Sequence, residues 1–115
     1  MVTVYGIKNC DTMKKARAWL DSHGKAYVFH DYKTQGIERD RLEGWAEKVG
    51  WEILLNRAGR TFRKLADKDK EGLTKAKAVA LMLAQPSMIK RPVVEIGRGQ
   101  VIVGFSVNEY EKIFK

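Results

Sequence analysis

The N-terminal third of the chain changes from a strand-forming run to a helical spacing of apolar residues and back again. Residues 2–5 are strand formers, and apolar residues then recur three and four positions apart between residues 13 and 20. Gly24 closes the predicted helix, and residues 26–30 form a second β run. This order of strand, helix and strand predicts a parallel β-α-β unit.

The middle of the chain is expected to be helical. Apolar residues at helical spacing predict one amphipathic helix over residues 42–49 and another over residues 76–83. Between them, Thr61 is expected to cap a short helix over residues 62–65. The charged residues 67–72 predict a solvated connection.

The last quarter of the chain predicts a β-hairpin followed by a helix. Residues 93–96 and 101–103 are β runs on either side of a turn that contains Arg98. Ser106 and Glu109 form a capping box at the start of the final helix. This helix is expected to bury three side chains: Val107, Tyr110 and Phe114.

In chain order, these elements give β-α-β, a helical insertion at about residues 36–86, and β-β-α. The sequence therefore predicts an α/β fold with a mixed four-stranded sheet and helices packed on it. We expect one domain over residues 1–115, because this length suits a single core.

Composition and charge limit the location and the partners. No apolar run approaches the roughly 20 residues needed to cross a bilayer. The N-terminus reads as a strand and not as a cleavable leader, so we expect a cytoplasmic protein with no membrane partner. The net charge of +8 is spread along the chain, a pattern that does not favour nucleic-acid binding.

The chain has a single cysteine, Cys10, which cannot form a disulfide within the chain. The two histidines, His23 and His30, offer no zinc-ligand cluster beside it. We therefore expect neither a structural disulfide nor a metal site.

A lone cysteine is commonly a small buried hydrophobe, but the surroundings of Cys10 favour a reactive thiolate. It follows a strand and a short loop and opens the predicted helix, where unpaired N–H groups and the helix dipole favour an anion. Lys8 and Lys14 add positive charge that is expected to lower the thiol pKa further. Asp11 is expected to interact with the helix N-terminus and not with the sulfur.

Arg91 and Pro92 stand just before the first strand of the hairpin. A proline at the start of a strand either limits pairing at a sheet edge or follows a peptide bond fixed in the cis form. The residues alone favour the trans form, which is the commoner state of such bonds.

Four segments together resemble the ArsC/Spx family, and in particular its small bacterial YffB-type branch, over essentially the whole chain. They are residues 5–12 (YGIKNCDT), 54–57 (LLNR) with 61–65 (TFRKL), 89–94 (IKRPVV) and 103–105 (VGF). The resemblance implies a thioredoxin-like fold with a helical insertion, a cis bond at Pro92, and Cys10 as the nucleophile.

The resemblance also allows a comparison with the arsenate reductases of the family, which use arginines to hold the oxyanion and react with glutathione and glutaredoxin. Arg91 matches the arginine before the active-site proline, and the arginine of the insertion falls on Asn56 or Arg57. The third arginine falls on Val103 or Gly104 and is missing. A bound oxyanion would lose one charge-assisted partner, which argues against arsenate reduction.

The Spx regulators of the family carry a second cysteine three residues after the first. Met13 occupies that position in this chain. The sequence therefore excludes a dithiol switch at this place.

We interpret the chain as a monothiol, glutathione-dependent thiol reductase: the Cys10 thiolate attacks a disulfide or oxidised sulfur, and glutathione resolves the mixed disulfide. Cys10 and Arg91 are the predicted catalytic residues, and the predicted substrate-binding residues are Lys8, Asn9, Lys14, Arg57 and Pro92. Glutathione is the expected co-substrate, glutaredoxin or a protein disulfide is a further candidate partner, and we expect a monomer. Two alternatives remain, a glutaredoxin-coupled arsenate reductase and a Spx-like regulator that binds a subunit of the transcription machinery without catalysis.

Overall fold

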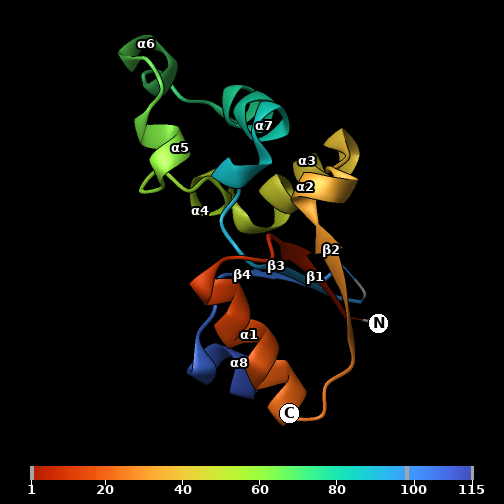
Figure 1. Cartoon of the computed structure of the whole chain (residues 1–115). Coiled ribbons are helices and arrows are strands. Elements are labelled where there is room, and N and C mark those ends of the chain that lie inside the picture. Colours follow the sequence, from red (N-terminus) through yellow and green to blue (C-terminus); the bar gives the residue numbers. More distant parts are fainter. Residues whose placement is uncertain (1, 98, 115) are drawn as a thin grey trace. The chain divides into compact units, whose positions relative to one another are not determined.

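The computed structural model describes residues 2–97 and 99–114, and the chain divides into two compact units. One unit combines residues 1–35 with residues 91–115, and the other spans residues 36–90. The first unit carries the sheet, and the second is helical (Figure 1).

The first unit is built on a mixed four-stranded sheet in the order β2-β1-β3-β4. β1 (Val2–Gly6) pairs in parallel with β2 (Tyr27–Asp31) and antiparallel with β3 (Val93–Ile96). β3 pairs antiparallel with β4 (Val101–Val103), which completes the predicted hairpin. The predicted mixed sheet is thereby confirmed, while Arg98 in the hairpin turn lies outside the described residues.

Two helices, α1 (Asp11–Ser22) and α8 (Val107–Ile113), lie side by side on one face of this sheet (Figure 1). The apolar positions at helical spacing in α1 face the sheet, because only that arrangement removes them from water. The buried cluster contains Val4, Met13, Ala16, Trp19, Leu20, Val94, Ile102, Tyr110 and Phe114. The rings of Trp19 and Tyr110 meet edge to face with centroids 5.5 Å apart.

The start of α8 agrees with the sequence, except at one residue. Ser106 is the N-cap, and its side chain accepts a hydrogen bond from the Glu109 N–H at 3.4 Å. Val107 was expected to be buried but is 45% exposed, because it opens the helix and lies beyond the core cluster. Tyr110 and Phe114 are buried as predicted.

The second unit consists of two longer helices and several single turns. α3 (Arg39–Val49) packs on α7 (Lys75–Ala84), and these are the two predicted amphipathic helices. The shorter elements are α4 (Trp51–Leu54), α5 (Arg60–Arg63), α6 (Asp67–Lys70) and a 3₁₀ turn over Pro86–Met88.

The prediction of Thr61 as a helix cap is wrong, whereas the solvated connection over residues 67–72 is exposed or half-buried as predicted and also contains a short helical turn. Gly59, and not Thr61, is the N-cap of α5, and Thr61 lies inside the helix with its hydroxyl 3.0 Å from that of Ser87. The predicted solvated connection contains the helical turn α6. The Lys77 ammonium supports this region, since it donates to the carbonyl oxygens of Lys68 and Glu71 at 3.0 and 2.6 Å.

Candidate functional site

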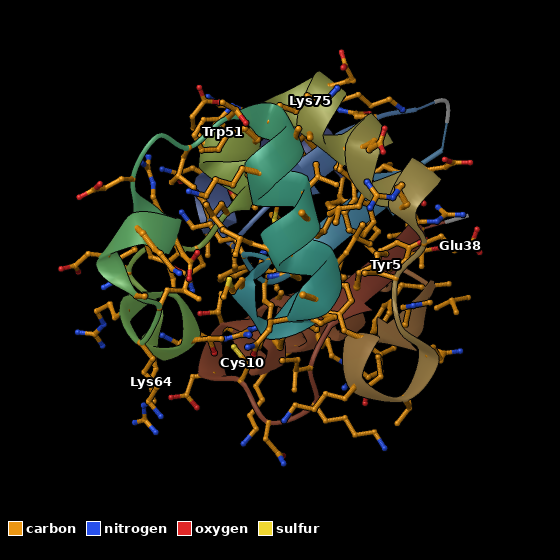
Figure 2. All side chains as sticks on the ribbon, turned by 90° about the horizontal axis from the view of Figure 1, so that it is seen from above. Tyr5, Cys10, Glu38, Trp51, Lys64 and Lys75 are labelled. Atoms are coloured by element: carbon orange, nitrogen blue, oxygen red, sulfur yellow. The ribbon has the colours of Figure 1, made fainter. Side chains whose placement is uncertain are left out.

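Cys10 is the N-cap of α1, at the end of the loop that follows β1 (Figure 2). Its backbone is extended, with φ −130° and ψ 128°, and its carbonyl accepts the first helical hydrogen bond from the Lys14 N–H at 3.0 Å. The side chain is partly exposed. A reactant can therefore reach the sulfur, which sits where the first N–H groups of the helix have no partner within the helix.

A close contact between β1 and α1 fixes the position of this N-terminus. Gly6 closes β1, and a side chain there would place its Cβ 2.2 Å from Sδ of Met13. Met13 is fully buried in the core one turn into the helix. Glycine at position 6 therefore leaves room for the buried Met13 side chain, which packs the first turn of α1 against the end of β1.

The electrostatic surroundings of the thiol favour its anion. Burial acts to raise the pKa of Cys10, but the backbone N–H of Met13, the hydrogen bonding and charge of the Arg91 guanidinium, and the backbone N–H of Thr12 act in the opposite direction. The pKa of Cys10 lies below its ordinary value as a result. The thiolate is the form that attacks sulfur.

Arg91 reaches Cys10 because of the sheet topology. β3 runs antiparallel to β1, with Val93 opposite Tyr5, so the residues just before β3 lie at the end of β1 that leads to Cys10. The Arg91–Pro92 peptide bond is cis, Pro92 is buried, and its carbonyl accepts the Gly104 N–H at 2.8 Å. The structure thus brings the two predicted catalytic residues, Cys10 and Arg91, together.

The other predicted site residues differ in where they lie. Lys8, Asn9 and Lys14 surround Cys10 in sequence and have exposed side chains. The groups that lower the thiol pKa are the two amides and Arg91, and neither lysine is one of them. Asp11 lies in the first turn of α1 as expected.

Arg57 and Asn56 both belong to the second unit. The Arg57 guanidinium lies over the ring of Trp51, 5.9 Å from its centroid, and the side chain is exposed. The Asn56 N–H donates to the Met88 carbonyl at 2.8 Å. The role assigned to Arg57 stays a prediction.

A group of polar residues near Arg91 was missed by the sequence interpretation. The Tyr5 hydroxyl donates to Oε1 of Glu95 at 3.0 Å, and the Tyr5 ring lies 4.8 Å from that of His30. Tyr32 opens α2 (Tyr32–Gln35) and is buried beside them, within the electrostatic reach of Arg91, Tyr5 and Glu95. The available signal was a polar residue within each of two mostly apolar strands, His30 in β2 and Glu95 in β3.

In the part of the chain that the structure describes, no three His, Cys, Asp or Glu side chains are grouped so that they could hold a metal ion. Over the same residues, no helix is both long and apolar enough to span a bilayer.

A family profile and two solved structures match nearly the whole chain. The sequence profile of the ArsC family matches residues 5–113. The solved structure of a protein named YFFB (PA3664) is 58% identical, with a TM-score of 0.94 and 97% of each chain covered. An arsenate reductase (ArsC) related protein from Brucella melitensis is 56% identical, with a TM-score of 0.79 over 99% of this chain and 94% of that one.

A relative with a regulatory name also matches. The global transcriptional regulator Spx of Streptococcus mutans is 30% identical over 112 residues, which cover 95% of this chain and 80% of the regulator. The structures that resemble this chain share the thioredoxin-like arrangement of a mixed sheet and helices that the element order predicts.

Proposed function

Because the chain belongs to the ArsC family, we propose that it is a glutathione-dependent monothiol reductase with Cys10 as its nucleophile. Proteins similar to this chain carry names that refer to arsenate reduction or to transcriptional regulation. A reactive cysteine is consistent with the first of these two activities. The assignment of a monothiol mechanism rests on the geometry of the Cys10 site and on the absence of a second cysteine from the sequence.

The placement of Cys10 is the observation that carries the proposal. Its sulfur lies at the N-terminus of α1, Arg91 and two backbone amides favour the thiolate, and the position one turn later holds the buried Met13. A thiolate without a second thiol in the chain must be resolved by a thiol from outside. Glutathione is the abundant cytoplasmic thiol, and the cytoplasm is the compartment we propose for this protein.

The proposed reaction has two exchanges. The Cys10 thiolate attacks one sulfur of a mixed disulfide between a protein and glutathione, so that a Cys10–glutathione disulfide forms and the protein leaves as a thiolate that takes up a proton. A second glutathione thiolate then attacks the glutathionyl sulfur, which releases oxidised glutathione and restores the Cys10 thiolate. In sum, one glutathione thiol is oxidised for each protein thiol released.

The remaining predicted site residues act on binding in this proposal. Lys8 and Arg91 attract the carboxylates of glutathione, and the backbone around Pro92 faces the peptide across from Cys10. Asn9 and Lys14 flank the bound sulfur. The protein works as a monomer, with glutaredoxin or a protein disulfide as its other partner.

Turnover of a glutathionylated peptide tests the proposal. Wild-type protein with reduced glutathione should release the free peptide and form oxidised glutathione, and Cys10→Ser should abolish this activity. A Cys10→Ser variant that is as active as the wild type would overturn the proposal, and so would a wild type that is no faster than glutathione alone.

Arsenate reduction is a second candidate, which the name of the Brucella melitensis relative favours. Val103 and Gly104 stand where a third oxyanion-binding arginine would be expected, so we rank it below thiol reduction. A regulator that docks on a subunit of the transcription machinery is a third candidate, which the Spx relative favours. Capture of such a subunit should survive Cys10→Ser, whereas thiol reduction should not.

A further inference from the structure

Tyr32 is a buried polar residue of the first unit whose hydroxyl has no hydrogen-bond partner among the described residues. The side chain is 2% exposed, and the hydroxyl oxygen is itself buried. Buried hydroxyls are nearly always hydrogen-bonded, because an unpaired one gives up its bonds to water without replacement. An orphaned hydroxyl of this kind points to a partner that the described residues do not supply.

Local hydrogen bonds fix Tyr32 in place. The Asp31 carboxylate accepts the Lys33 N–H at 2.8 Å, and the Gln35 side-chain oxygen accepts the Asp31 N–H at 3.1 Å. These bonds hold the short helix α2 to the end of β2, although a single turn has little stability of its own. The tyrosine is therefore held in its buried position by its own neighbours.

The topology brings Tyr32 to the same end of the sheet as Cys10. β1 and β2 are parallel, and Asp31 lies opposite Gly6, so both strands end together. Tyr32 directly follows one strand end, and Cys10 closes the loop that follows the other. Ligands of α/β proteins commonly bind outside the carboxyl ends of parallel strands.

Arg91 links the two side chains electrostatically. Its charge lowers the pKa of Cys10. Burial raises the pKa of Tyr32 far above its usual value, and the Arg91 charge opposes this rise. The guanidinium is therefore within reach of both groups, and Tyr32 stays protonated as a neutral donor.

We propose that a bound carboxylate that Arg91 attracts displaces the groups that cover the Tyr32 hydroxyl, so that the hydroxyl donates a hydrogen bond to one carboxylate oxygen and becomes a substrate-contact group of the Cys10 site. One cation and one neutral donor match a singly charged carboxylate, which has two oxygens to accept them. A doubly charged oxyanion would leave more charge unmatched. The inference deepens the proposed function, because it names the group of the co-substrate that the site recognises.

Two alkylating reagents of similar size test this contact without glutathione. The Cys10 thiolate displaces iodide from iodoacetate or from iodoacetamide, and only iodoacetate carries a carboxylate. The ratio of the two rate constants, iodoacetate over iodoacetamide, therefore reports recognition of a carboxylate beside the sulfur. In Tyr32→Phe this ratio should fall about threefold or more, while the pH dependence of iodoacetamide alkylation stays unchanged.

Two matched variants control for loss of a tyrosine hydroxyl. Tyr27→Phe removes a hydroxyl at the other end of β2, where it accepts from Nε of Arg17 at 3.1 Å, and it should leave the ratio unchanged. Tyr110→Phe removes a buried hydroxyl that donates to the Gly104 carbonyl at 2.9 Å, and it should lower Tm. Tyr32→Phe should keep or raise Tm, because it removes a hydroxyl that has no partner in the described part of the chain.

Three results would overturn the proposal. An unchanged ratio means that Tyr32 does not contact the carboxylate. Equal losses with both reagents, or a shifted pH profile, mean that Tyr32 acts on the thiol itself. A fall in Tm like that of Tyr110→Phe means that the hydroxyl has a structural partner. None of these depends on glutathione, so the proposed function can fail while this contact stands.

Discussion

The guanidinium of Arg91 lies beside the Cys10 thiol and lowers its pKa, although the two residues come from opposite ends of the chain. The pairing of β1 with β3 is what brings them together. In the proposed reaction Arg91 therefore has two tasks, since it favours the thiolate and attracts the carboxylate of the co-substrate.

The first prediction concerns the pH dependence of Cys10. The thiol should stay ionised at a lower pH than an ordinary cysteine, and Arg91→Ala should shift its pKa upward, because the variant loses a cation that favours the anion. The rate of iodoacetamide alkylation followed against pH gives both values. A midpoint that is the same in wild type and Arg91→Ala would remove Arg91 from the site.

A second prediction concerns a second thiol at the position of Met13. Met13→Cys places a second thiol one helical turn after Cys10, and this variant should form an internal disulfide in place of a stable glutathione adduct. Loss of a fully buried side chain should also destabilise the fold by roughly 1–3 kcal/mol. Lys15→Cys, at an exposed position five residues on, should form no internal disulfide. Thiol counts before and after oxidation distinguish the outcomes.

A third prediction concerns the contact beneath the loop. Gly6→Ala would force a Cβ against the buried Met13 sulfur, and this overpacking should lower the free energy of unfolding by about 1–3 kcal/mol. Gly44→Ala, within α3 and with open space around it, should instead add about 0.5–1 kcal/mol. Denaturant unfolding of the two variants is the measurement. Equal effects would mean that the Gly6 contact does not constrain the helix.

A fourth prediction concerns arsenate. Turnover with arsenate, glutathione and glutaredoxin should be lower than that of an authentic arsenate reductase by about 10²-fold, the usual cost of losing one preorganised donor to an oxyanion. A side-by-side assay at equal protein concentration measures the difference. Comparable rates would show that another group replaces the arginine missing at Val103 or Gly104.

The elements that could be predicted from sequence are those with regular apolar spacing over several helical turns or with a clear N-cap residue. The apolar spacing of α1, α3 and α7 extends over several turns, and Ser106 marks the start of α8. Single turns such as α4 and α6 have no period to detect, because tertiary contacts hold them. Thr61 has the side chain of a cap, but its hydroxyl bonds to Ser87, which is distant in sequence.

In the candidate site too, some residues could be recognised from the sequence and others could not. Cys10 could be recognised from the strand, loop and helix around it, and Arg91 from the family resemblance. Tyr32 could not be recognised, because a tyrosine after a strand is ordinarily a core residue. Its orphaned hydroxyl becomes visible only in the folded structure, where β2, which Tyr32 follows, ends beside β1.

The mass of the intact protein after exposure to oxidised glutathione tests the central claim most directly. One glutathionyl group should add at Cys10, accumulate, and leave on addition of reduced glutathione, and Arg91→Ala should slow both steps by about tenfold. Arg39→Ala, which removes an exposed arginine paired with Glu43 at 3.5 Å, should change neither rate. Absence of an adduct on the folded wild-type protein, or equal rates for the two arginine variants, would contradict the account.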